Sequence, residues 1–121
     1  MRSRTAATLF LAAVIGIASG CASNRTIPMK VQSDPLGAYV VMKYKGGQSA
    51  DSDWIYLGNT PLTTQRRFHK DELTDSQVLV LRLMKDGYLE QTREWHGKEL
   101  RNIEDEHGQL FWNPKLVPSS N

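Results

Sequence analysis

The side chain with the clearest potential for chemistry is Cys21, the single cysteine of the chain. It follows three small residues, Ala, Ser and Gly at 18–20, at the end of an apolar stretch. With no second cysteine the chain cannot form an internal disulfide bond, and an unpaired thiol would be a liability in an exported protein. The position of Cys21 therefore favours a sulfur that is covalently modified.

The apolar stretch predicts a secretory signal peptide over residues 1–20. Arg2 and Arg4 open it, and residues 5–17 carry no charge. This length matches the apolar region of secretory signals, about 7–15 residues, and falls short of the about 20 residues that a transmembrane helix needs. We expect the segment to direct export and to be removed.

Residues 18–21 (Ala-Ser-Gly-Cys) resemble the lipobox of bacterial lipoproteins, although that family prefers Leu where this chain has Ala18. The resemblance implies that Cys21 is acylated and becomes the first mature residue, with 21–30 as a lipidated N-terminus and tether to the lipid bilayer. In enteric-type bacteria an Asp after the cysteine retains lipoproteins at the inner membrane, so Ala22 implies the outer membrane, facing the periplasm. The alternative is an ordinary signal peptide that leaves a free thiol.

Catalytic and metal-binding patterns are weak. The sequence has no Gly-x-Ser-x-Gly elbow, no His-Glu-x-x-His and no Gly-rich phosphate loop. We therefore predict no catalytic residues, no cofactor and no metal site. A metal-dependent hydrolase stays as the least favoured alternative, because three histidines and an acidic stretch could gather in space, although they lack short ligand spacing: His69, His96, His107, Glu104, Asp105 and Glu106.

Charge argues against a nucleic-acid partner. Once residues 1–20 are removed, the mature part has equal numbers of acidic and basic residues, and it lacks the basic surface that binds phosphates. The pair Arg66 and Arg67 is interpreted as part of a solvated loop. The mature length of about a hundred residues is typical of one compact domain.

The apolar pattern predicts an all-β sandwich of about six or seven strands. Residues 78–84 alternate most clearly and should form a central strand, while 68–73 are expected to be no more than a loop. The charged residues 98–107 show no long helical period. The other predicted strands cover 27–32, 38–44, 54–57 and 88–95, with a last apolar segment from 110 to 117 and turns at 33–37, 58–61 and 85–87.

Three blocks along residues 31–95 resemble a PEGA domain, in the order of that family's pattern. The blocks are Ser-Asp-Pro-Leu-Gly-Ala at 33–38, Gly-Asn-Thr-Pro at 58–61 and Gly-Tyr at 87–88. The resemblance implies a small β-sandwich of the carboxypeptidase-regulatory, transthyretin-like type, with 96–121 as an extension that completes or covers it. Turn chemistry explains the residue types of the blocks: Pro35, Gly37, Gly58, Thr60, Pro61, Gly87 and Tyr88.

Aromatic residues are more numerous than a small core needs. Trp54, Tyr56 and Trp95 are therefore candidates to contact a ligand, because an exposed aromatic ring offers a large contact area with a polar group at its edge. The alternative is that most of them are core residues.

These features together favour a noncatalytic, lipid-anchored lipoprotein of the cell envelope. We expect it to act as a binding or scaffolding module for another envelope protein or for peptidoglycan. A carbohydrate-binding accessory that uses exposed aromatic side chains is the alternative from a different class. A sandwich fold by itself specifies no ligand.

Overall fold

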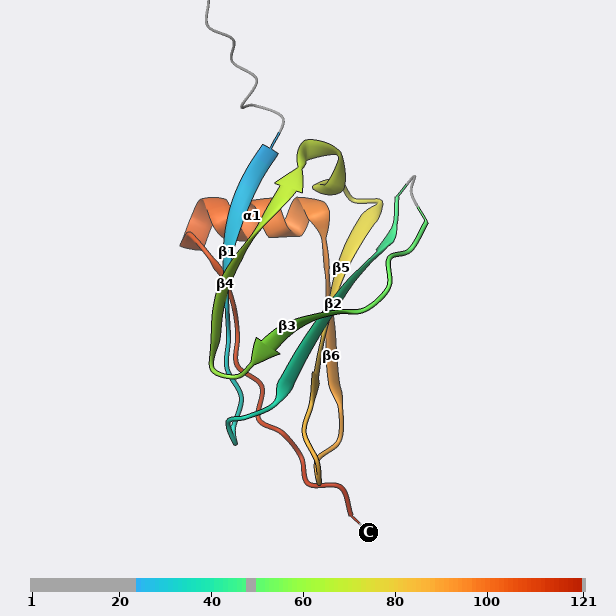
Figure 1. The fold of residues 1–121 in the computed structure, drawn as a ribbon. Helices are drawn as coiled ribbons and strands as arrows, with labels where there is room; N and C mark the ends of the chain where they lie inside the picture. Colours follow the sequence, from blue (N-terminus) through green and yellow to red (C-terminus); the bar gives the residue numbers. More distant parts are fainter. Residues whose placement is uncertain (1–23, 48–49, 121) are drawn as a thin grey trace, which may run out of the picture.

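The computed structural model describes residues 24–47 and 50–120 and forms a sandwich of two β-sheets (Figure 1). The smaller sheet has the strand order β4-β1-β7 and the larger one β3-β2-β5-β6. The prediction of a small all-β sandwich is confirmed. The strands are β1 (Asn24–Val31), β2 (Tyr39–Gly46), β3 (Ile55–Asn59), β4 (Leu62–His69), β5 (Gln77–Met84), β6 (Gln91–His96) and β7 (Leu110–Trp112).

The core lies between the inner faces of the two sheets. Alternate residues of β1 point inward and are fully buried, as are alternate residues of β5 on the facing sheet, in the period of two that a strand imposes. β5 lies between β2 and β6, so its predicted central place is confirmed. The residues concerned are Ile27, Met29 and Val31 of β1 and Leu79, Leu81 and Leu83 of β5.

Strand β4 corrects the interpretation of Arg66 and Arg67 as part of a solvated loop, and it also includes Phe68 and His69 from the predicted loop at 68–73. It pairs antiparallel with β1 along its whole length, from Asn24 beside His69 to Val31 beside Leu62. Its inward positions include Thr64 and Arg66, so the strand lacks a continuous apolar alternation. A short 3-10 helix, η2 (Lys70–Glu72), follows it. The pairing also places residues 24–30, which we assigned to the tether, inside the sheet.

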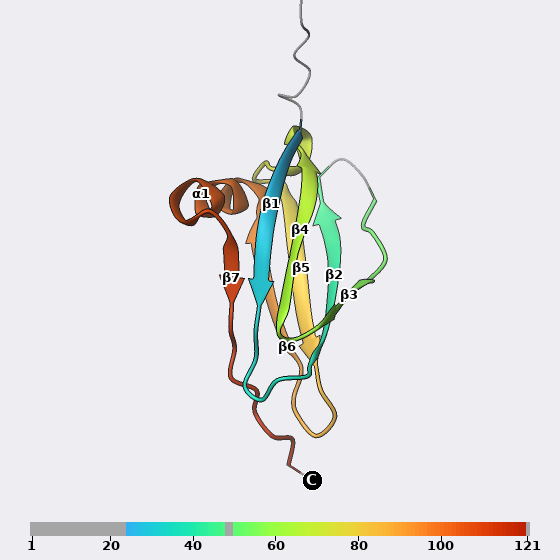
Figure 2. The ribbon, with the colours of Figure 1, turned by 60° about the vertical axis from the view of Figure 1, so that its left-hand side comes forward.

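Helix α1 (Gly97–His107) corrects the expectation that the charged stretch near the C-terminus is irregular. Its residues are mostly good helix formers, but Leu100 is its one large buried side chain, so the apolar period is too weak to detect. The helix starts against η2: a Cβ added at Gly97 would lie 2.4 Å from the Glu72 carbonyl oxygen. Figure 2 shows α1 beside β7, which runs parallel to β1.

The tail after β7 joins the two sheets. The Leu116 amide donates to the Asp34 carbonyl oxygen at 2.8 Å, and the Leu89 amide donates to the Val117 carbonyl oxygen at 2.8 Å. Leu116 is buried. The 96–121 extension therefore supplies a helix, a strand and a cross-connection between the sheets.

Figures 1 and 2 place the start of β1 and the C-terminal tail at opposite ends of the sandwich. We call the end with the start of β1 and η2 the proximal end. The distal end comprises the turn at 33–37, the corner at 58–61, the β5–β6 hairpin at 85–90 and the tail at 113–120.

One buried hydroxyl organises the corner between β3 and β4. Thr60 Oγ1 accepts hydrogen bonds from the amides of Gly37 (3.0 Å) and Ala38 (2.9 Å), and it lies 2.6 Å from Ser33 Oγ. Ser33 Oγ donates to the Pro35 carbonyl oxygen at 2.7 Å, so the Thr60 hydroxyl is the donor to Ser33. Each of the two hydroxyls therefore both donates and accepts a hydrogen bond within the corner. The corner thus holds together two blocks more than twenty residues apart.

Replacing Thr60 by Val, which has nearly the same shape, should lower the free energy of unfolding by about 1–3 kcal/mol, because the buried Ala38 amide loses its acceptor. Urea denaturation measures this loss. The slope of the free energy of unfolding against urea concentration should be the same as in the wild-type protein. Thr60→Ser keeps the hydroxyl and serves as the matched control. A Val variant that is as stable as the Ser variant would contradict the role of the hydroxyl.

Tyr44 is a half-buried phenol at the edge of the core. Its ring packs edge-on against Phe68, with centroids 6.0 Å apart. Burial raises the pKa of Tyr44 above 10.0, while a hydrogen bond to Arg66 acts in the opposite direction. The folded protein therefore holds this proton more tightly than the unfolded chain. The resulting stability is fully present below the ordinary tyrosine pKa of about 10 and is lost as the pH rises through the raised value.

We expect the wild-type protein to lose more stability than Tyr44→Phe between about pH 8 and about pH 11. Urea denaturation at the two pH values measures the difference within each protein, which cancels the cost of the substitution itself. Equal losses in the two proteins would show that Tyr44 does not contribute to alkaline destabilisation.

Candidate functional site

The predicted turn residues all lie at the distal end, and their backbone geometry serves the turns. Gly37 has φ +96° and Gly58 has φ +141°, conformations that residues with a Cβ rarely adopt. Pro35 and Pro61 both follow cis peptide bonds. Gly87 lies in the β5–β6 hairpin, with φ +84°. These positions shape the surface without presenting side chains for chemistry.

Trp95 is a core residue. Its side chain is 1% exposed and its ring packs edge-on against Trp112, with centroids 5.8 Å apart. It occupies the inward position of β6, where the exposed Glu94 and His96 flank it. The structure therefore places Trp95 among the core residues, which is the alternative for these aromatic side chains, because its position in the strand turns the ring inward.

Trp54 precedes β3 and lies over the outer face of the larger sheet. The Lys43 ammonium is 4.9 Å from the ring centroid and the Arg82 guanidinium is 4.4 Å from it. Cation–π contacts of exposed groups contribute about 0.5–1 kcal/mol each. The indole is 37% exposed, so part of its surface is occupied by the cations of the chain itself.

Tyr56 is the most exposed of the three predicted aromatic residues, at 60%. It lies beside Tyr39, with centroids 6.2 Å apart and an angle of 54° between the rings. The Tyr56 hydroxyl hydrogen-bonds to the Asn59 side-chain oxygen. Tyr39 itself is about half exposed, and its partnership with Tyr56 could not be inferred before β2 and β3 were known to pair.

Exposed apolar side chains gather at and near the distal end. Four that are about half exposed come from the turn, the start of β2, the hairpin and the tail, and Tyr56 contacts one of them. Exposed apolar groups that gather in one region mark interaction sites more often than single ones do. We call this set the distal patch: Leu36, Tyr39, Tyr56, Leu89 and Val117.

A hollow of about 260 Å³ adjoins the distal patch. Tyr39 and Tyr88 contribute aromatic walls, and the hairpin adds the charged groups of Lys85 and Glu90. The Tyr88 backbone bridges to Pro118 of the tail, so the wall is supported from behind. The hollow is large enough to take a side chain from a partner.

A second cleft, of about 500 Å³, opens on the side of the sandwich between β6, α1 and β7. Trp95 forms its floor, while Ile103 and Phe111 line it from the helix and from β7. The Arg93 guanidinium lies 4.9 Å from the Trp95 ring centroid. Phe111 is the one large apolar side chain of this cleft that is half exposed.

The histidines lie apart and have local partners. His69 Nδ1 accepts the Asp71 amide at 3.2 Å, and His96 Nδ1 lies 2.8 Å from the Asp75 carbonyl oxygen. His107 ends α1. Glu104 and Asp105 form ion pairs with Arg25. Over residues 24–47 and 50–120, no three His, Cys, Asp or Glu side chains come together as a metal site would need.

The predicted lipidation site, Cys21, lies outside the described residues. In the part of the chain that the structure covers, no helix combines the length and apolar character needed to cross a membrane.

Comparison with known proteins gives no assignment: no protein-family model, no curated protein and no solved structure matches this chain.

Proposed function

We propose that the chain is a noncatalytic, lipid-anchored lipoprotein of the cell envelope that binds another envelope protein through its distal patch. The observation that carries the proposal is the position of this patch. Five of the seven large apolar side chains that are exposed in the described residues lie at or near the end opposite the start of β1. A domain anchored at its N-terminus would present that end to the aqueous space.

The anchor rests on the sequence around Cys21. Acyl chains bind a bilayer through about 0.8 kcal/mol for each buried methylene, so two or three chains hold a protein firmly. The outer membrane, with the domain facing the periplasm, is the proposed location because Ala22 follows the cysteine. The PEGA-like character is supported by the corner, where Ser33, Gly37 and Ala38 of the first block meet Thr60 of the second.

The composition of the distal patch suits a protein partner. Tyrosines are enriched at the centres of protein interfaces, where the ring is buried and the hydroxyl finds a partner. Apolar area removed from water contributes about 25 cal/mol per Å². The hollow beside Tyr39 would let a partner side chain bury area on more than one side.

Cys21→Ser should abolish incorporation of labelled palmitate and move the protein from the membrane fraction to the aqueous fraction. The substitution removes the thiol that the acyl chains require and leaves the described domain untouched. Metabolic labelling followed by fractionation measures both effects. Label that persists in the variant would refute acylation at this residue.

A photoreactive amino acid placed at position 39 or 89 should cross-link to a protein in intact cells, whereas the same group at position 111 should not. Phe111 is the matched control because it is exposed to the same degree as Leu89 but lies on the side cleft. Immunoblotting detects the products by their size. Cross-links from position 111 alone would transfer the proposal to the side cleft and reject the distal patch.

Carbohydrate binding is the second candidate, and the observation in its favour is the exposure of the neighbouring Tyr39 and Tyr56 rings. Sugar rings stack on flat aromatic surfaces, but these two rings are tilted by 54°. If this function holds, the protein should pellet with purified peptidoglycan, and Tyr56→Ala should weaken pelleting several-fold. Pelleting that is absent in the wild type, or equal in the two proteins, would reject this candidate.

A further inference from the structure

The first described strand begins very close to the predicted acylation site. β1 starts at Asn24, so only Ala22 and Ser23 separate it from Cys21. Consecutive Cα atoms are about 3.8 Å apart, so the Cα atoms of Cys21 and Asn24 can be at most about 11 Å apart. The tether that the sequence alone predicted, 21–30, is thus mostly part of the sheet.

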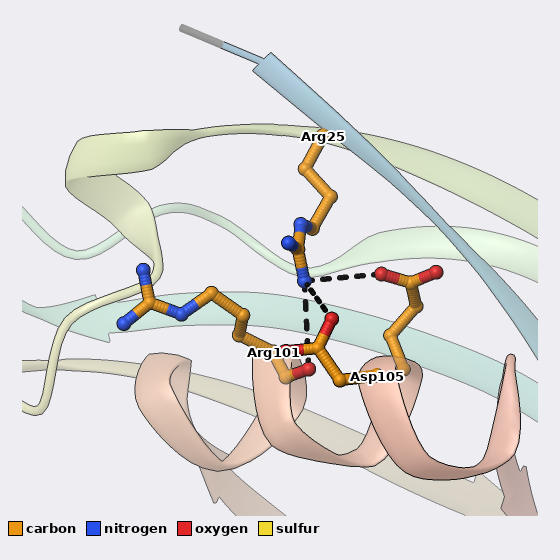
Figure 3. Close-up of polar contacts among 4 residues, drawn as sticks. Arg25, Arg101 and Asp105 are labelled. Carbon is orange, nitrogen blue, oxygen red and sulfur yellow. Dashed lines mark hydrogen bonds and ion pairs between the residues drawn. The ribbon is translucent and has the colours of Figure 1, made fainter. Parts of the chain in front are cut away.

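Arg25 fixes the start of β1 to α1 (Figure 3). Its Nη1 atom lies 2.9 Å from Asp105 Oδ1 and 3.1 Å from Glu104 Oε1, and it donates to the Arg101 carbonyl oxygen at 3.5 Å. Surface ion pairs contribute modestly one by one, but here one guanidinium nitrogen contacts three acceptors on one helix. The strand is therefore tied to the domain from its second residue onward.

The proximal end is polar. Lys70, Asp71 and Asp75 are exposed there, and acidic groups outnumber basic ones along the segment from η2 to β5. No member of the distal patch lies at this end. Such a surface is compatible with a hydrated headgroup layer, and the acidic excess of the segment from η2 to β5 disfavours an anionic one.

We propose that the proximal end lies directly on the headgroups of a zwitterionic bilayer, so that the domain stands end-on and holds the distal patch away from the membrane. The inference rests on the acylation of Cys21 in the proposed function. The eight residues of β1 span about 26 Å at about 3.3 Å each. Together with the short tether, this places the distal patch within about 40–50 Å of the bilayer. The partner must therefore expose its binding surface near the same membrane.

Energy transfer to labelled lipids tests this arrangement. The acylated full-length mature protein is incorporated into phosphatidylcholine vesicles that contain a trace of acceptor-labelled lipid. A donor dye is attached to Lys70→Cys at the proximal end or to Asp86→Cys in the hairpin, both exposed positions. Acylation blocks the thiol of Cys21. We expect transfer from position 70 to be several-fold stronger than transfer from position 86.

A flexible insertion of about twelve Gly and Ser residues after Ser23 should remove most of this difference, because such a linker spans roughly 20 Å on average. Arg25→Gln should reduce the difference, since it releases the start of β1 from α1, whereas Arg93→Gln should leave it unchanged. Equal transfer from positions 70 and 86 with the natural tether would overturn the end-on arrangement alone. A protein that does not float with the vesicles would overturn the anchor and this inference together.

Discussion

The structure depends on the packing of two inner sheet faces against each other. With one cysteine, the chain cannot add an internal disulfide to this contact. The contact between the buried faces of β1 and β5 therefore stabilises the fold. The remaining elements cover the open sides of the sandwich. The Thr60 corner closes the side of β3 and β4. Helix α1 and the tail close much of the side of β6 and β7, except for the cleft above Trp95.

The central strands were predictable because apolar residues recur at alternate positions along them. In β5 three of the four inward positions are Leu, after Gln77 at the start of the strand, and the register of a strand with a buried apolar face follows from its period of two. β4 was missed because two of its four inward positions are the polar Thr64 and Arg66, which are only partly buried. α1 was missed because a helix that covers the edge of a sheet needs only a narrow apolar contact, here Leu100 with partial help from Ile103.

The surface was less predictable than the core. Alternation along β2 places Tyr39 on the face of the strand away from the buried Val40, so the exposure of Tyr39 could be deduced. The other members of the distal patch could not be grouped in this way, because a backbone hydrogen bond brings Leu89 and Val117 together from segments far apart in the sequence. Trp95 was proposed as a ligand contact because the chain has more aromatic residues than a small core needs. Its strand instead places the tryptophan on the inner face, between the exposed Glu94 and His96.

The place of β1 between β4 and β7 has a mechanical consequence. A pull on the N-terminus of the domain acts along the axis of the central strand of the smaller sheet. Such a force loads the hydrogen bonds on both sides of β1 in shear, so that many must rupture together, whereas a force across the ladder would break them one after another. With eight residue pairs joining β1 to β4, the strand that would lie nearest the membrane in the proposed arrangement is also the one best placed to carry tension between the bilayer and a partner bound at the distal end.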